Sequence, residues 1–219
     1  PNDIPAVAIV DPELMYSMPK GLTAATGMDA LTHAIESYIT PGAWVMSDMF
    51  ELKAIEMIAQ NLKAAVDNGK DVAAREAMSQ AQYIAGMGFS NVGLGIVHSM
   101  AHPLGAFYDT PHGVANALLL PYVMEYNAES PAAPKYIHIA KAMGVDTTGM
   151  SEAEGVKAAV EAVKALSASI NIPQKLHEIN VKEEDIPALA VAAFNDVCTG
   201  GNPRPTSVAD IEALYRKAF

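Results

Sequence analysis

The segment GMDALTHAIESYITPG (residues 27–42) has the pattern of a buried helix followed by a stop. Apolar side chains at positions 28, 31, 35 and 38 keep the alternating three- and four-residue spacing of one helix face. Thr40-Pro41-Gly42 then ends the helix, because proline cannot donate to the backbone ladder and glycine favours a turn. The segment therefore predicts a helix that belongs to a hydrophobic core.

The same periodicity continues along most of the chain after Lys20. The Gly-rich stretch 91–110 predicts a less regular backbone, and residues 127–134 predict a short loop. Ser151 and Glu154 have the spacing of a capping box, which marks a helix start. The further predicted helices cover about 44–66, 72–87, 113 through Pro121 and beyond, 151–170, 184–197 and 207–219.

One short apolar run precedes the helices. Ala6-Val7-Ala8-Ile9-Val10, closed by Asp11-Pro12, predicts a strand, and no second convincing strand follows. The predicted fold class is therefore all-α, with six to nine helices preceded by one short strand. Because a lone strand needs partners and the chain begins at Pro1, we expect it to be a fragment of a longer protein; the alternative is a native N-terminus trimmed by processing.

Composition excludes several classes of protein. The chain has 219 residues, of which 51% are hydrophobic and 18% charged, which excludes a disordered chain. Its net charge of −11 argues against nucleic acid and anionic membranes as partners. A single cysteine, Cys198, excludes an intramolecular disulfide and fits a reducing cytoplasm. No apolar run reaches the ~18 residues of a membrane span.

Two pairs of polar residues stand four positions apart. Asp29 and His33 form the first pair and His98 and His102 the second, and each spacing places both side chains on one helix face. His112 follows in a segment that enters the next predicted helix. The remaining histidines, His138 and His177, lie outside this group.

The surroundings of His33, His98 and His102 are apolar, so these side chains are expected to be buried. A buried imidazole needs a partner at both ring nitrogens. Either the histidines satisfy one another, or they hold a metal with Asp29. Several histidines and a carboxylate at one-turn spacing favour a metal, and nitrogen and carboxylate donors suit zinc, iron, nickel or manganese. Such a cation would act as a Lewis acid on a substrate oxygen.

Several motifs in the chain resemble one known family. These are GMDALTH (27–33), GIVHSMAHPLG (95–105) and PHG (111–113), supported by residues 83–95 and 196–204. Together they resemble the iron-containing (group III) alcohol dehydrogenases over essentially the whole chain. The loop around Cys198 is similar to the corresponding loop in the branch of that family that acts on lactaldehyde and 1,2-propanediol.

The resemblance implies a role for each matching residue. Asp29, His33, His98 and His112 match the four metal ligands, usually for Fe²⁺, with Zn²⁺ or Ni²⁺ as substitutes. His102 matches a histidine beside the metal that helps to move the alcohol proton. Phe89 and Cys198 match residues that line the substrate pocket. The implied reaction is the NAD-dependent interconversion of a small alcohol and its aldehyde.

The family also implies a second domain. Its members carry an N-terminal α/β domain whose Gly-Gly-Gly-Ser-type loop binds the cofactor phosphates, and this chain has no such segment. We therefore expect residues 1–19 to be a remnant strand and linker of that nucleotide-binding domain. Residues 20–219 would form the helical metal-binding catalytic domain, which resembles the C-terminal domain of dehydroquinate synthase. The full-length protein is expected to be a homodimer.

Three alternatives remain open at this point. The chain could come from a related metal-dependent glycerol or 1,3-propanediol dehydrogenase. It could be a metalloenzyme on the same scaffold that uses no nicotinamide. It could also be a non-catalytic helical domain whose histidines only satisfy each other.

Overall fold

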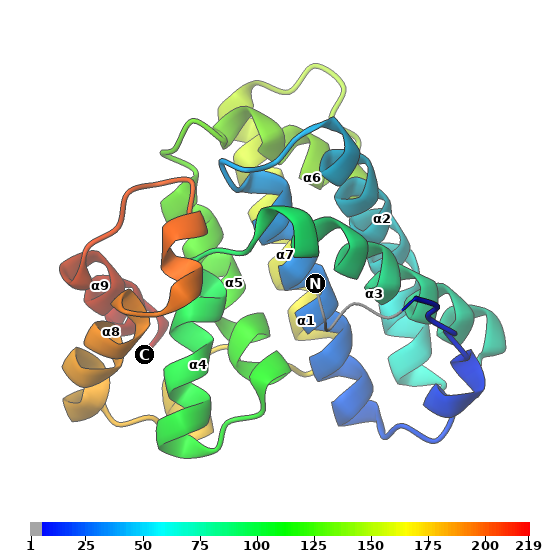
Figure 1. The fold of residues 1–219 in the computed structure, drawn as a ribbon, viewed down its shortest axis with the longest axis horizontal. Coiled ribbons are helices and arrows are strands. Elements are labelled where there is room, and N and C mark those ends of the chain that lie inside the picture. The colour runs from blue at the N-terminus through cyan, green and yellow to red at the C-terminus, as the bar shows by residue number, and fades with distance from the viewer. Residues whose placement is uncertain (1–5) are drawn as a thin grey trace.

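The computed structural model describes residues 6–219, and this part of the chain is built from helices (Figure 1). Within it, nine α-helices confirm the predicted all-α fold class. They are α1 (Lys20–Ile39), α2 (Val45–Asp67), α3 (Val72–Val92), α4 (Ile96–Tyr108), α5 (His112–Asn127), α6 (Tyr136–Ala142), α7 (Glu152–Ser169), α8 (Ile186–Phe194) and α9 (Val208–Ala218). Short 3-10 turns include η1 (Pro12–Met15) and η5 (Val197–Gly201).

Helix α1 occupies the middle of the molecule. In Figure 1 the pair α2 and α3 lies on one side of it and the pair α4 and α5 on the other, with α8 and α9 beyond α4. Met28, Leu31 and Ile35 are completely buried, which confirms the predicted core face of α1. A helix packed on several sides buries most of its surface, and α1 thus connects the two halves of the domain.

The predicted helix boundaries hold in several places. Ser151 and Glu154 form the predicted capping box of α7, and Ser207 caps α9 in the same way with Asp210. Helix α5 continues through Pro121, as expected. Helix α3 extends five residues beyond the predicted end, to Val92.

Residues 91–110, predicted to be irregular, contain the regular helix α4. The irregularity is confined to its start, where Gly93 adopts φ +85° and Gly95 is the N-cap. After that point Ile96, Met100 and Leu104 are fully buried on one face. Burial of this face outweighs the low helix propensity of the neighbouring glycines and of Pro103.

The predicted strand at residues 6–10 is wrong. Residues 6–219 contain no strand, and Val7 and Ile9 are largely exposed to solvent. A strand exists only through hydrogen bonds to a neighbouring strand, and none of the described elements supplies one. Helix α6 was not predicted, because the sequence analysis placed only a loop before it.

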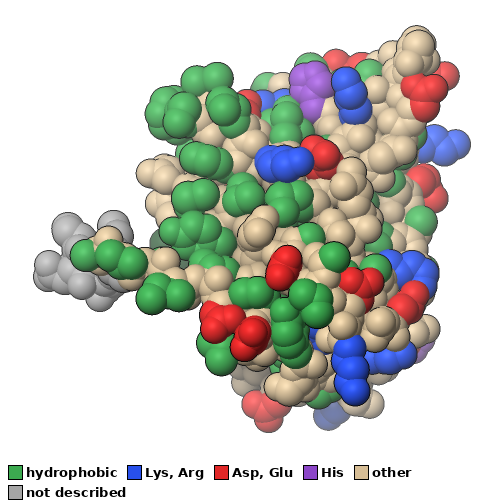
Figure 2. Space-filling view, turned by 90° about the vertical axis from the view of Figure 1, so that its right-hand side faces the viewer, with side chains coloured by type: hydrophobic (Ala, Val, Ile, Leu, Met, Phe, Trp, Pro, Cys, Tyr) green, Lys and Arg blue, Asp and Glu red, His purple; other side chains and the backbone are tan. Residues whose placement is uncertain are grey.

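Figure 2 shows the face that forms the right-hand side of Figure 1. Most of the apolar side chains on this face lie in the left half of the view, and most of the Lys and Arg side chains lie toward the right. The exposed apolar side chains at the start of α2 are Trp44, Val45, Met46 and Met49. Among residues 6–219, no helix combines the length and the apolarity needed to cross a lipid bilayer.

Candidate metal centre

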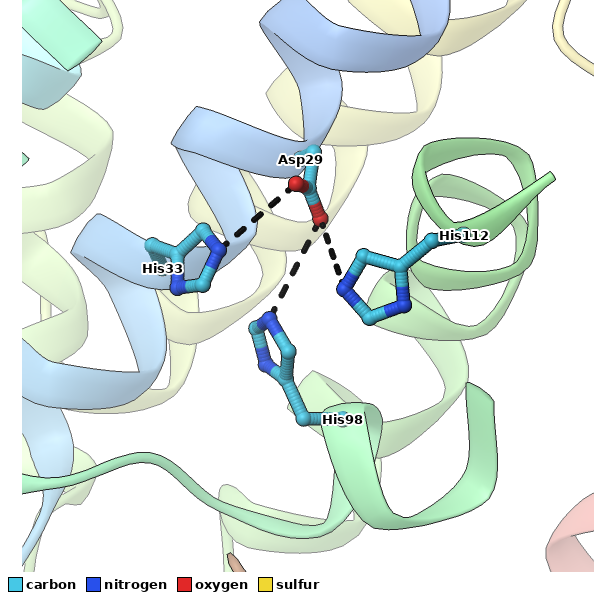
Figure 3. A group of neighbouring side chains, drawn as sticks. All are labelled: Asp29, His33, His98 and His112. Carbon is cyan, nitrogen blue, oxygen red and sulfur yellow. Dashed lines mark ion pairs between the residues drawn. The ribbon is translucent and has the colours of Figure 1, made fainter. Parts of the chain in front are cut away.

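Asp29 and His33 project side by side from the middle of α1 (Figure 3). His33 Nε2 lies 3.6 Å from Asp29 Oδ2. The four-residue spacing places them one helical turn apart, as the sequence analysis predicted. The ring of His33 stacks on Phe89 of α3 with centroids 4.4 Å apart, and this contact holds the imidazole plane.

His98 reaches the same point from the first turns of α4. Its side chain is buried, and its Nε2 atom lies 4.0 Å from Asp29 Oδ1. Its Nδ1 atom lies 2.5 Å from Glu36 Oε2. The far side of the His98 ring is therefore held by a carboxylate, while Nε2 points toward Asp29 (Figure 3).

His112 is the first residue of α5, and its Nε2 atom lies 3.4 Å from Asp29 Oδ1. Asn116, one turn later, donates from Nδ2 to Asp29 Oδ1 at 2.6 Å and lies 3.0 Å from His112 Nε2. The adjacent Gly113 allows α5 to approach α1 closely, since a Cβ atom there would lie 2.3 Å from the Ala25 carbonyl oxygen. This close approach brings His112 within reach of Asp29.

The structure thus brings together all four residues that were predicted as ligands. One donor atom from each of Asp29, His33, His98 and His112 lies within 4.8 Å of the other three. Three imidazole nitrogens and one carboxylate oxygen form a donor set that suits Fe²⁺ or Zn²⁺.

An orphaned polar atom tests whether this donor set fits a cation. His98 Nε2 is buried and has no hydrogen-bond partner among the described residues. Its 4.0 Å separation from Asp29 is too long for a hydrogen bond. A buried ring nitrogen without a partner is costly unless something else binds it. The geometry therefore favours a bound cation over histidines that satisfy one another.

The electrostatics of the site favour the metal-binding forms of Asp29 and His112. Burial alone would raise the pKa of Asp29, but the neighbouring imidazoles of His33 and His112 and the hydrogen bond from Asn116 lower it. Burial lowers the pKa of His112. The neighbouring imidazoles of His98, His102 and His33 lower it further, while the carboxylate of Asp29 opposes the shift. A carboxylate and a neutral imidazole are the ligand forms of these two side chains.

His102 lies beside the four-residue group and outside it. It follows His98 by one turn of α4, and its ring centroid lies 5.4 Å from that of His112. Its Nδ1 atom lies 2.7 Å from Asp196 Oδ2. The side chain is 42% exposed, so the prediction that His102 is buried is wrong: it lies at the edge of the site. A carboxylate at Nδ1 leaves Nε2 available for a proton exchange with a neighbouring molecule.

The two predicted pocket residues lie in different places. Phe89 borders a cavity of about 480 Å³ that Asp29, His33 and Met78 also line. Cys198 lies in η5 and does not line that cavity. Burial and the neighbouring Asp196 raise the pKa of the Cys198 thiol to about 12, so it stays protonated at neutral pH.

Sequence reasoning missed three polar residues that support the site: Glu36, Asn116 and Asp196. Glu36 contacts His98 and Asp196 contacts His102, and in both pairs the two residues are far apart in the sequence. Asn116 contacts Asp29, and it also follows His112 by one helical turn. Glu36 left one signal, because an acidic residue within an apolar helix face needs a buried partner. His138 and His177 lie apart, and they contact Tyr38 and the Phe219 carbonyl respectively.

Known proteins resemble this chain over its whole length. Residues 23–219 match the model of the Fe-containing alcohol dehydrogenase family, C-terminal. The chain is 59% identical over its whole length to lactaldehyde reductase of Escherichia coli (strain K12), and it covers 56% of that protein. It is 47% identical over 218 residues to 1,3-propanediol dehydrogenase of Klebsiella pneumoniae, again covering 56% of the relative.

Solved structures show the same fold. The crystal structure of a 1,3-propanediol oxidoreductase superposes with a TM-score of 0.97 at 47% identity, over 99% of this chain and 56% of that one. An alcohol dehydrogenase from Oenococcus oeni superposes with a TM-score of 0.93 at 41% identity, over 95% of this chain and 54% of that one. The chain therefore spans about half the length of the relatives it matches.

Proposed function

Since the chain belongs to the Fe-containing alcohol dehydrogenase family and matches its C-terminal part, we propose that it is the metal-binding half of an NAD-dependent alcohol dehydrogenase. The proposed reaction interconverts lactaldehyde and 1,2-propanediol or similar small alcohols and aldehydes. The observation that supports it most strongly is the convergence of Asp29, His33, His98 and His112, with His98 Nε2 buried and unpaired among the described residues.

The proposed ligands are Asp29 Oδ and the Nε2 atoms of His33, His98 and His112, and the proposed cation is Fe²⁺, with Zn²⁺ or Ni²⁺ as substitutes. When bound, a divalent cation at this site supplies Lewis-acid polarisation of an alcohol or aldehyde oxygen. Asp196 accepts from Nδ1 of His102, and this contact orients the ring so that Nε2 exchanges the substrate proton. Phe89 lines the neighbouring cavity and restricts the size of the substrate.

The nucleotide site is proposed to lie in an N-terminal domain, which corresponds to the part of the relatives that this chain does not cover. The chain contains no Gly-rich phosphate loop after a strand, which is the usual cradle for a dinucleotide. In this proposal residues 1–19 connect the helical domain to an N-terminal α/β domain, and residues 20–219 carry the metal. The complete protein is proposed to be a cytoplasmic homodimer.

The substrate proposal rests on similarity. Lactaldehyde reductase of Escherichia coli is 59% identical to this chain, whereas 1,3-propanediol dehydrogenase of Klebsiella pneumoniae is 47% identical. A 1,3-propanediol dehydrogenase is therefore the second candidate. Comparing kcat/KM for 1,2- and 1,3-propanediol in the complete protein separates the two.

An anaerobic titration of the chain with Fe²⁺ and then Zn²⁺ tests the metal site. We expect tight one-to-one binding, and we expect His98→Ala to abolish it because that variant removes the buried donor. The matched control is His177→Ala, which removes a histidine that lies outside the group of four and contacts Phe219 at the C-terminus. Calorimetry with each metal measures the stoichiometry and the Kd.

Equal binding by the His98→Ala variant and the parent chain would show that the ligand set is wrong. Absence of binding by the parent chain would favour histidines that serve only the fold. Loss of binding in both variants would point to unfolding, which circular dichroism detects.

We further predict that this chain alone does not oxidise NADH, although it binds metal. The physical reason is the absence of a phosphate-binding loop, without which the nicotinamide has no fixed position. The measurement is the absorbance of NADH with lactaldehyde and metal-loaded protein. Robust turnover by the isolated chain would contradict the prediction, and the complete protein serves as the positive control.

A further inference from the structure

Glu36 is a buried carboxylate that contacts the metal centre from behind. It lies on α1 three residues after His33, and only 2% of its surface is exposed. Ionised side chains are almost never buried unless they are paired or strongly hydrogen-bonded. Among the described residues its ion pair is with His98, and it makes none with Lys or Arg. The other favourable contact must come from the backbone.

That second contact is the N-terminus of α4. Oε1 of Glu36 accepts the backbone N–H of Val97 at 2.6 Å, and Oε2 lies 2.5 Å from Nδ1 of His98. The N-cap of α4 is Gly95, which has no side chain to accept a first-turn N–H. Glu36 therefore supplies from another helix the capping oxygen that α4 lacks, and its negative charge is stabilised by the helix N-terminus.

Close packing makes this arrangement specific. A Cβ atom at position 95 would lie 2.8 Å from Glu36 Oε1 and 3.2 Å from Asn202 Oδ1. Glycine at this position thus leaves the space that the carboxylate occupies. The two oxygens of Glu36 hold neighbouring residues of α4, so the register of α4 against α1 and the orientation of the His98 ring are set by one side chain.

The contact also selects the tautomer of His98. A carboxylate only accepts hydrogen bonds, so the proton of a neutral His98 ring must be on Nδ1. The lone pair is then on Nε2, the atom that faces Asp29 and has no partner in the described structure. We propose that Glu36 is a positioning residue that holds His98 as the Nδ1–H tautomer and so prepares Nε2 to bind a cation. The part of this inference that concerns metal affinity rests on the proposed function, whereas the tautomer does not.

The decisive variant is Glu36→Gln. Its single side-chain oxygen must accept the Val97 N–H, so its NH₂ group faces His98 Nδ1. That nitrogen then becomes an acceptor and the proton moves to Nε2. The ring ¹⁵N shifts of His98 in the metal-free chain distinguish the two neutral tautomers and the doubly protonated ring, and so report the tautomer directly. We expect the Nε2–H form in Glu36→Gln and the Nδ1–H form in the parent chain.

The second measurement is Zn²⁺ affinity, measured by competition with a chromophoric chelator. We expect Glu36→Gln to weaken binding by roughly 10- to 100-fold, the usual effect of removing a carboxylate behind a ligating histidine. The matched control is Glu51→Gln, which makes the same change at another buried glutamate, on α2 and against Gly88 of α3. It should leave the His98 tautomer and the Zn²⁺ affinity unchanged.

Glu36→Asp covers the case in which Glu36→Gln does not fold. It keeps a carboxylate, so we expect the Nδ1–H tautomer to persist with an affinity between those of the parent chain and Glu36→Gln. An unchanged tautomer in Glu36→Gln, or the Nε2–H form in Glu36→Asp, would overturn the proposal. If the tautomer responds as expected but the parent chain binds no Zn²⁺, the metal function fails while the positioning of His98 by Glu36 stands.

Discussion

Replacing Gly113 with alanine is expected to destabilise the chain by roughly 3 kcal/mol, the upper part of the range for an overpacked site. The added Cβ would lie 2.3 Å from the carbonyl oxygen of Ala25 and 2.6 Å from its carbonyl carbon. Both atoms belong to the backbone of α1, so no side chain can rotate to make room. Helix α5 must move away from α1, and because His112 precedes Gly113, we expect Zn²⁺ binding to weaken as well.

The matched control is Gly86→Ala in the interior of α3. Among residues 6–219, nothing lies within 4 Å of a Cβ atom at that position. Alanine is the better helix former, so this variant is expected to stabilise the chain by about 0.5–1 kcal/mol. Urea unfolding measures the change in stability of each variant, and a Zn²⁺ titration measures the change in metal binding. Equal unfolding midpoints for Gly113→Ala and the parent chain would contradict the close packing of α5 on α1.

The second large effect is expected at Glu51. This side chain of α2 is completely buried, and neither carboxylate oxygen has a hydrogen-bond partner within the described structure. It lies against α3, where a Cβ atom at Gly88 would meet its Oε1 atom. Burial raises the pKa of Glu51 to about 8; the neighbouring Ser37 opposes the rise and Asp48 adds to it. The folded protein therefore favours the protonated acid.

This raised pKa makes stability depend on pH in a definite direction. Between the ordinary pKa of 4.5 and the folded value of about 8, the folded chain binds a proton that the unfolded chain has lost. The contribution of Glu51 is therefore fully present below about pH 4.5 and is lost as the pH rises through about 8. Relative to the parent chain, Glu51→Gln should gain stability over this window by about 5 kcal/mol.

Urea unfolding of both proteins at several pH values from about 5 to about 9 measures this difference, because this range covers most of the expected change in stability. Glu56→Gln is the control, since Glu56 lies on the same helix with its side chain 42% exposed. Its stability difference should stay nearly constant with pH. Parallel curves for Glu51→Gln and the parent chain would show that the Glu51 carboxyl is hydrated or paired in solution.

Local patterns were sufficient for most of the fold. The apolar positions of α1 and the capping box of α7 involve residues only a turn or so apart, and the structure confirms both. Helix α4 was harder to predict from the sequence. Its start depends on the backbone at Gly93 and Gly95, and its regular helical structure depends on burial against other helices. The predicted strand at residues 6–10 failed because a strand needs a hydrogen-bonded neighbour, and periodicity within one segment carries no information about it.

The sequence by itself determined which side chains are available to bind a metal. Asp29 with His33, and His98 with His102, lie on shared helix faces because the pitch of a helix places residues four apart on one side. Only the tertiary structure decided that His102 stays outside the group of four and that Glu36 lies behind His98, 62 positions away. The physical reason is that helix geometry acts over one turn, whereas the approach of α1, α4 and α5 depends on packing at residues such as Gly95 and Gly113.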